Sequence, residues 1–446
     1  MTGSSQSSPR LTDHVVLISI DGLRPHIYRD DRWPAPVLHE LVRRGAMALA
    51  VRSVFPALTY PAHTTIVTGA LPARHGVVDN ETFDPVAPTG RWIWDAAAIR
   101  VPTLWDGVRA RGGTTAAISW PVTLGARIDW NVPDVWAPDA PGSIAPIRAA
   151  ATPPGLFEEL EREATGRLSD ATFSLDTLGR EDVVGAMAAY LFERYRPTLM
   201  LVHAIGLDHV RHRLGRDNPR ARRAVAAADR AVARIVETVE RLNLLDRTTF
   251  VVTGDHGSID VHTALLPNVW LRDAGLTPPH PTGTSWRAAF HASGGSAFLR
   301  LQPSTEAHGH TLAAIRHALE ALPDGVRTLF RVVDRAELDR LAAEPEAVLA
   351  LAAAPGVVFS PDRDGPAVQA AHGAGHGYLP DVPDMLTGFV AAGAGVRTGA
   401  VVPLLPMQHI APFIAALLGL DMPDVDGTLL PGLLSTTPEV APSQRP

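Results

Sequence analysis

Three aspartates each stand just past a short apolar run: Asp21 after VVLISI, Asp208 after LMLVHAIGL and Asp255 after FVVTG. His212 lies four residues after the second aspartate, and His256 directly follows the third. Apolar runs without polar alternation are typical of strands buried on both faces of a parallel sheet, and ligands collect at the carboxyl ends of such strands. Any one of these residues could be a simple turn or capping residue. Together at one rim, carboxylates and imidazoles would repel each other unless cations lay between them, so the pattern predicts a metal centre with more than one ion.

A second chemical feature is the segment FPALTYPAHTTIVTGALPARHGVVDN, residues 55–80. Pro61 lies near the expected start of a short helix and Gly69 just past its end, which places Thr59 on the N-cap side. The dipole and free N–H groups of a helix N-terminus favour anions. The Thr59 hydroxyl could cap the helix, or it could act as a nucleophile toward phosphorus, activated by cations at the three-aspartate rim. The residue types alone leave both roles open.

The composition narrows the chemistry further. The chain has 446 residues, a net charge of -7 and no cysteine, and all 40 of its basic residues are arginine. The mild acidity argues against stable nucleic-acid binding. The absence of cysteine excludes thiolate zinc sites, iron–sulfur clusters and cysteine nucleophiles, and the absence of lysine excludes Schiff bases and the P-loop lysine. Chemistry on phosphate would therefore depend on metals, arginine, hydroxyls and backbone amides.

The sequence has no apparent signal or membrane segment. The N-terminal residues MTGSSQSSPRLTD are polar and lack the apolar core of a secretory signal. The most apolar late stretch, residues 410–420, is too short to cross a bilayer. We therefore expect a cytoplasmic protein that does not bind membranes.

Strands and helices alternate along most of the chain, which predicts an α/β fold with a largely parallel central sheet sandwiched by helices. The expected strands of this sheet are 14–20, 114–120, 198–205, 248–253 and 385–393. The expected helices around it are 35–45, 61–68, 103–111, 155–164, 180–195, 217–242 and 407–419.

The pattern changes over residues 267–371, which we expect to form a small inserted α+β lobe. Its expected elements are strands 296–302 and 328–334 and helices 309–322 and 335–342. The main domain then comprises residues 13–266 and 372–433. Residues 1–12 and 434–446 are Ser/Pro-rich tails that need not be ordered.

The ordered motifs resemble the alkaline phosphatase superfamily and, within it, the nucleotide pyrophosphatase/phosphodiesterase family. The resemblance rests on IDGLRP (20–25), the TYP and HGVVDN motifs within 59–80, Asp208 with His212, GDHG (254–257) and GHGY (375–378). These blocks follow the family order and cover the main domain nearly end to end. The resemblance implies an alkaline-phosphatase-like fold.

The resemblance also implies a centre of two Zn²⁺ ions, with other divalent metals as an option. The implied ligands are Asp208, His212 and His376 for one ion, and Asp21, Asp255, His256 and the Thr59 hydroxyl for the other. Thr59 would be the nucleophile and would form a phospho-threonine intermediate. Asn80 would donate a hydrogen bond to a phosphoryl oxygen, and the Tyr60 ring could stack on a base.

Other histidines and arginines have weaker readings. Three histidines are expected to be structural: His63, His75 and His203. Four histidines have no assigned role: His209, His262, His291 and His372. Three arginines could contact substrate phosphate, namely Arg24, Arg74 and Arg211. The sequence departs from the family at Ala62, where relatives often have asparagine.

The resulting hypothesis is a hydrolase of phosphodiester or pyrophosphate bonds in small, nucleotide-like substrates. Within the superfamily, a phosphonoacetate-hydrolase-like enzyme that cleaves C–P bonds and a phosphomonoesterase stay open as alternatives. A relative that only binds a ligand is a more remote alternative. The oligomeric state is not predicted.

Overall fold

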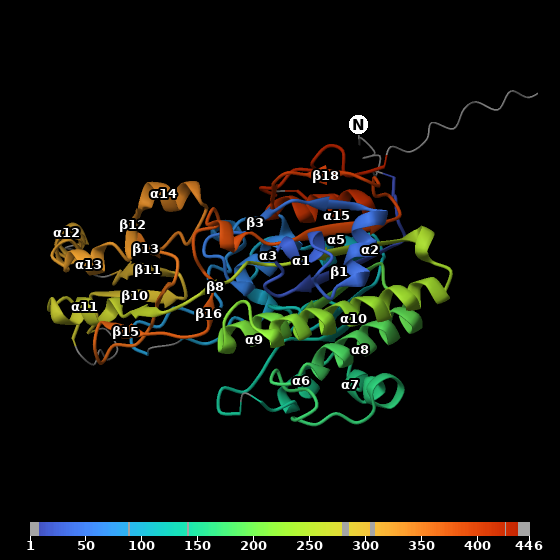
Figure 1. The fold of residues 1–446 in the computed structure, drawn as a ribbon, viewed down its shortest axis with the longest axis horizontal. Coiled ribbons are helices and arrows are strands. Elements are labelled where there is room, and N and C mark those ends of the chain that lie inside the picture. Colours follow the sequence, from blue (N-terminus) through green and yellow to red (C-terminus); the bar gives the residue numbers. More distant parts are fainter. Residues whose placement is uncertain are drawn as a thin grey trace, which may run out of the picture.

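The computed structural model describes residues 9–87, 90–140, 142–278, 285–303, 308–423 and 425–435. Figure 1 shows a larger part built around a central sheet and a smaller part around helices α11–α14. None of the helices in these described ranges is long and apolar enough to cross a membrane.

The central sheet has eight strands in the order β18-β2-β17-β7-β1-β6-β4-β5. Neighbouring strands are parallel except at β17, which runs antiparallel to both β7 and β2. The strands are β1 (His14–Ile20), β2 (Ala46–Ala48), β4 (Thr115–Ile118), β5 (Trp130–Val132), β6 (Leu199–Ala204), β7 (Thr248–Thr253), β17 (Phe389–Gly393) and β18 (Val401–Val402). The predicted largely parallel sheet is confirmed.

Helices cover both faces of this sheet (Figure 1). Val16, Ile18 and Ile20 of β1 share one buried cluster with α2 (Pro36–Arg44), α8 (Gly179–Tyr195) and α10 (Pro219–Arg241). Val15 and Leu17 share another with α3 (Thr59–Thr68), α5 (Leu104–Ala110) and α15 (Ile410–Leu418). Because side chains alternate along a strand, a run as rich in apolar residues as VVLISI supplies both clusters.

The smaller part contains an antiparallel sheet in the order β10-β11-β13-β12. Its elements are β10 (Ala288–Ser293), β11 (Ser296–Leu301), β12 (Phe330–Asp334), β13 (Leu349–Ala353), α11 (Pro267–Asp273), α12 (His308–Glu320), α13 (Asp324–Arg327) and α14 (Arg335–Arg340). A separate three-stranded sheet joins β9 (Thr263–Leu265) to β14 (Val357–Phe359) and β15 (Val368–Ala370). Strand pairing thus continues across residue 267, and the domain limits stay a prediction.

Two local expectations need correction. The helix expected at 61–68 begins at Thr59, so Thr59 is the first helical residue and Leu58 is the N-cap. The structure also contains α9 (Gly206–Leu214), a helix that follows β6 and is not among the predicted elements. Both differences matter because these two helices carry predicted site residues.

Candidate metal centre and substrate cavity

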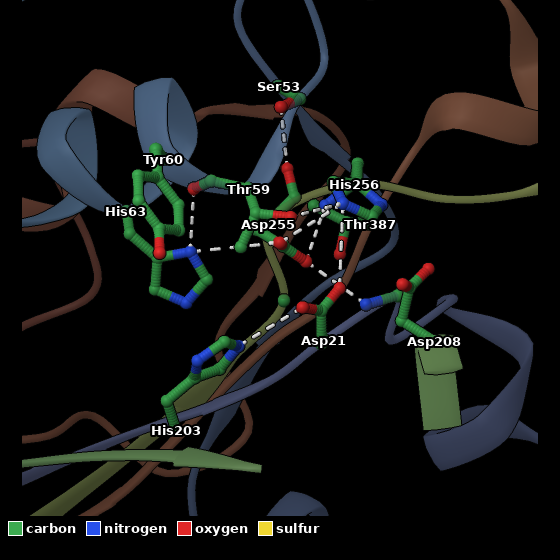
Figure 2. A network of polar contacts seen from close by, with 12 residues as sticks. Asp21, Ser53, Thr59, Tyr60, His63, His203, Asp208, Asp255, His256 and Thr387 are labelled. Atoms are coloured by element: carbon green, nitrogen blue, oxygen red, sulfur yellow. Dashed lines mark hydrogen bonds and ion pairs between the residues drawn. The ribbon is translucent and has the colours of Figure 1, made fainter. Parts of the chain in front are cut away.

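The three aspartates meet where three adjacent strands end. β1 lies between β6 and β7 and is parallel to both, so their carboxyl ends share one edge of the sheet. Asp21 follows β1, Asp255 follows β7 by two residues, and Asp208 lies in the first turn of α9 after β6. All three are at most 7% exposed. Figure 2 shows their side chains approaching one another.

The first ligand group consists of Asp208, His212 and His376, whose ligand atoms all lie within 4.8 Å of one another. The spacing of four residues on α9 puts Asp208 and His212 on one helix face, with Nε2 3.0 Å from Oδ2. The Nε2 atoms of His212 and His376 are also 3.0 Å apart. Ligand atoms around one zinc ion with bonds near 2.0–2.1 Å lie roughly 3.3 Å apart, which these distances approach.

The other ring nitrogens explain why these Nε2 lone pairs face inward. Nδ1 of His376 lies 3.2 Å from the Ala57 carbonyl oxygen, and Nδ1 of His256 lies 2.9 Å from that of Gly257. His212 likewise has a backbone hydrogen bond to Ala374. A nitrogen that donates its N–H to a carbonyl leaves Nε2 unprotonated, the arrangement that metal-bound histidines usually have.

The second ligand group differs slightly from the prediction. Asp21, Asp208 and His256 have ligand atoms within 4.8 Å of one another, so Asp208 stands between the two groups. Asp255 is close by, with Oδ2 3.2 Å from His256 Nε2. Its Oδ1 accepts hydrogen bonds from the N–H groups of Gly22 and His256, at 3.0 and 2.9 Å. The division of ligands between two ions stays a prediction.

Unpartnered oxygens test whether this site fits a cation. Asp21 Oδ1 and Asp255 Oδ2 are buried and have no hydrogen-bond partner among the described residues. Burial, with the charges of Asp255 and Asp208, raises the pKa of Asp21 well above its usual value, and burial also raises the pKa of Asp255. Such oxygens are costly to bury alone. Divalent cations would neutralise them, so the residues fit a metal centre.

Two of the imidazoles are ready to act as ligands at neutral pH. Burial lowers the pKa of His256 to about 4 and that of His376 to about 3. Burial alone would raise the pKa of Asp208, but His212 and His376 outweigh it and hold this pKa well below its usual range. Metals bind neutral imidazole and ionised carboxylate, so the shifts of His256, His376 and Asp208 favour coordination. The charge of Asp208 raises the pKa of its partner His212, so a bound cation would have to displace a proton there.

Thr59 lies at the edge of the same cluster. Its Oγ1 is 3.3 Å from His256 Nε2, and the N-cap residue of helix α3 is Leu58 rather than Thr59. The capping role considered from the sequence is therefore wrong. The backbone carbonyl oxygen of Thr59 lies 2.8 Å from Nδ1 of His63, which is one helical turn later in the chain. This contact helps to fix the start of helix α3. The hydroxyl is free for chemistry beside the predicted ligands.

Asn80 is held next to the start of α3. Its Oδ1 accepts the backbone N–H of Tyr60 at 2.8 Å, which leaves its Nδ2 as the donor toward the cavity. The Tyr60 ring itself is 1% exposed and packs against Trp92, with ring centroids 5.2 Å apart. Its hydroxyl lies 3.5 Å from an oxygen of Asp134. Tyr60 is among the residues that line the cavity, and its stacking on a base stays a prediction.

The centre opens into a cavity of about 910 Å³ that also reaches the smaller part of the molecule. The sequence analysis missed several residues of its wall, namely Asp79, Glu81, Trp92, Asp134, Trp136 and Arg180. Burial raises the pKa of Asp134 to about 6. Only Asp79 carries a sequence signal, because it belongs to the HGVVDN motif that ends at Asn80. The others lie in loops or at a helix start, where no period or motif marks them.

The remaining histidines fall into two sets. His63, His75 and His203 are at most 1% exposed, as expected for structural residues. His203 also contacts the centre, with Nε2 3.2 Å from Asp21 Oδ2. Three histidines without an assigned role line the cavity, namely His209, His291 and His372. His262 instead packs beside Gly356 outside it.

The three arginines considered as phosphate contacts do not line the cavity. Arg24 pairs with Asp384, and Arg74 pairs with Asp426. Arg211 is fully buried against Gly22. At the position of the family departure, Ala62 of helix α3 is fully buried in the core cluster on that face of the sheet.

Comparisons with known proteins agree with this architecture. A search of solved structures finds human ectonucleotide pyrophosphatase/phosphodiesterase 5, with a TM-score of 0.68 and 18% identity over 95% of this chain and 100% of that chain. It also finds an inactive variant of the murine protein in complex with AMP, with a TM-score of 0.68 and 19% identity, at the same coverage. At these identities, the likeness shows the alkaline-phosphatase-like fold.

Sequence comparisons give the family. An uncharacterised pyrophosphatase/phosphodiesterase of Schizosaccharomyces pombe is 28% identical over 264 residues, 58% of this chain and 47% of the relative. Human ectonucleotide pyrophosphatase/phosphodiesterase family member 5 is 24% identical over 250 residues, 54% of this chain and 44% of the relative. The chain thus spans about half the length of these curated relatives. The family model for type I phosphodiesterase / nucleotide pyrophosphatase matches residues 15–379. The chain therefore belongs to this family, within the alkaline phosphatase superfamily.

Proposed function

We propose that this protein is a metal-dependent hydrolase that cleaves phosphodiester or pyrophosphate bonds in small, nucleotide-like substrates. The observation that carries the proposal is the convergence of six carboxylates and imidazoles beside the Thr59 hydroxyl, at the wall of one cavity that four of them line. The family membership and the AMP bound by the murine relative support this substrate class. Zinc as the metal and two as the number of ions are part of the proposal.

The metal ligands would be the two groups described above, with Thr59 Oγ as a further ligand. Bound divalent ions would stabilise charge on the phosphoryl group and on the attacking and leaving oxygens. The structure contributes orientation: the strand ends and α9 fix the carboxylates, and backbone carbonyls fix the imidazoles. Donors aimed in advance at developing charge account for much of the rate gain in such sites.

Thr59 would perform the covalent chemistry, and Asn80 would orient the phosphoryl group. Thr59 Oγ attacks phosphorus, the new O–P bond forms, and the bond to the leaving oxygen breaks while the hydroxyl proton passes to solvent. Water then attacks the phospho-threonine, and the Oγ–P bond breaks to restore the hydroxyl. Nδ2 of Asn80 donates to a non-bridging phosphoryl oxygen throughout, because Tyr60 N–H holds the amide in that orientation.

Activity and metal content together test this function. Purified protein loaded with zinc should retain close to two ions and should hydrolyse bis(p-nitrophenyl) phosphate much faster than p-nitrophenyl phosphate. Faster hydrolysis of the monoester would favour a phosphomonoesterase, and phosphate release from phosphonoacetate would favour C–P cleavage. Absence of any hydrolysis despite bound metal would favour a relative that only binds a ligand.

Thr59→Ala tests the nucleophile. We expect turnover to disappear while the metal and the fold stay, because the other predicted ligands are untouched. Thr68→Ala is the matched control, since Thr68 ends the same helix and its hydroxyl bonds to the Thr64 carbonyl. Retained activity in Thr59→Ala would remove Thr59 from this role.

The cytoplasmic location stays a separate prediction, which cell fractionation would test.

A further inference from the structure

Arg211 is a buried cation beside the candidate metal centre that the proposed chemistry does not use. It is fully buried, and its Nη1 donates to the Gly22 carbonyl oxygen at 2.6 Å. Its Nε and Nη2 have no hydrogen-bond partner among the described residues. Burying a guanidinium in this way is costly. Its place in the fold therefore needs a reason.

The position of Arg211 on α9 suggests one. Asp208, Arg211 and His212 are three and four residues apart, so they lie on the same side of this helix. Two of them are predicted metal ligands, and the third reaches across to the turn that follows β1. Arg211 thus ties the helix that carries one ligand group to the segment that carries Asp21.

Gly22 is hydrogen-bonded both to Arg211 and to the third aspartate, Asp255. Its carbonyl accepts from Arg211, and its N–H donates to Asp255 Oδ1 at 3.0 Å. Gly22 has φ +70°, and a Cβ at this position would lie 3.3 Å from Arg211 Nη1 and 3.8 Å from Asp208 Oδ1. The backbone of this one residue is therefore held between α9 and Asp255, and only glycine fits the position without strain.

We propose that Arg211 is a positioning residue of the metal centre: by clamping Gly22 it fixes the separation of Asp208 from Asp21 and Asp255. The inference rests on the proposed metal-dependent function, and it concerns the spacing of the two ligand groups. Residues behind the ligands commonly change metal affinity or activity by about 10–100-fold when they are replaced.

A purely electrostatic role makes the opposite prediction. The Arg211 charge repels bound cations, so its removal alone would tighten metal binding. Loss of the clamp would instead let the ligand groups move apart and would weaken binding. The sign of the change therefore separates the two roles.

The experiment compares Arg211→Met and Arg211→Lys with the wild-type protein. Arg211→Met removes the charge and the donor, whereas Arg211→Lys keeps the charge on a side chain of shorter reach. Arg213→Met is the matched control, because Arg213 lies on the same helix, its side chain is 62% exposed and it pairs with Asp176. Zinc retention is measured against a competing chelator, and the visible spectrum of the Co²⁺-loaded protein reports the ligand geometry.

We expect both Arg211 variants to lose zinc about 10-fold more readily and to show an altered Co²⁺ spectrum, with the Arg213 variant unchanged. Wild-type zinc retention with an unchanged spectrum, or tighter binding in Arg211→Met, would overturn the proposal. If neither Arg211 variant folds, Gly22→Ala disturbs the same contact from the other side and should give the same loss. If the wild-type protein binds metal and cleaves diesters, and the Arg211 variants keep wild-type zinc retention and an unchanged Co²⁺ spectrum, only this inference is refuted and the proposed function stands.

Discussion

Replacing Asn80 should separate its effect on catalysis from its effect on stability. Asn80 holds two groups at once: its Oδ1 accepts the Tyr60 N–H at 2.8 Å, and its Nδ2 is the proposed donor to the phosphoryl oxygen. The Tyr60 N–H is in the first turn of α3 and has no helical partner, so Asn80 acts as a cap supplied from elsewhere in the chain.

Asn80→Ala removes both interactions. Loss of one such donor typically lowers kcat by about 100–1,000-fold, and an interaction made mainly in the transition state leaves KM nearly unchanged. The uncapped N–H should cost about 1–2 kcal/mol of unfolding free energy. At about 2.1 cal/mol/K for each of 446 residues, that lowers the unfolding temperature by about 1–2 °C.

Asn80→Asp should have a different signature. The carboxylate still accepts the Tyr60 N–H, and a negative charge near a helix N-terminus is favourable, so the unfolding temperature should not fall. The carboxylate also replaces the donor and repels the phosphoryl oxygen, so kcat should fall at least as far as in Asn80→Ala. Steady-state kinetics and calorimetry measure the two effects. A kcat within threefold of wild type in Asn80→Ala, or equal destabilisation by both variants, would refute the reasoning.

Three further predictions concern pH, the shared ligand and the close packing of the site. Burial lowers the pKa of His63, His75 and His203 to about 3. Unfolded histidine has a pKa near 6.5, so the unfolded state binds more protons below that value and stability is lost as pH falls toward 3, at up to about 1.4 kcal/mol per pH unit for each histidine. A flat urea midpoint between pH 7 and pH 5 would contradict this. Asp208→Asn should lower both the metal content after gel filtration and kcat/KM, because Asp208 belongs to both ligand groups. We expect kcat/KM to fall by more than about 100-fold. Full metal retention would argue against this shared position. Gly257→Ala should destabilise the protein by about 1–3 kcal/mol or more, because the added Cβ would lie 1.8 Å from the Asp384 carbonyl oxygen. Gly325→Ala is the control: no heavy atom of the described residues lies within 4 Å of its added Cβ, so thermal unfolding should be nearly unchanged.

The parts of the fold that could be predicted are those in which local pattern and burial agree. VVLISI and FVVT each contain one hydroxyl residue and are otherwise apolar because β1 and β7 are covered on both faces, and the sequence therefore marks both the strands and the aspartates at their ends. By contrast, β13 has the sequence LALAA, whose alanines have little intrinsic strand preference. Pairing with β11 and β12 stabilises it, and such pairing is not visible in a local stretch.

The candidate site divides in the same way. Asp208 and His212 could be paired by their spacing, although the short, arginine-rich helix α9 between Gly206 and Gly215 was not recognised. His376 lies in a glycine-rich loop and was assigned only through the family resemblance. Asp134 and Trp136 reach the cavity from a stretch without periodicity. Their positions depend on tertiary packing, which the local sequence pattern does not predict.

Anomalous X-ray diffraction at the zinc edge, from crystals grown with zinc, tests the central claim most directly. The account predicts two peaks about 4 Å apart. They should lie among the Nε2 atoms of His212, His256 and His376 and the three aspartates, with one of them next to Thr59 Oγ. A single peak, or peaks away from these side chains, would contradict it.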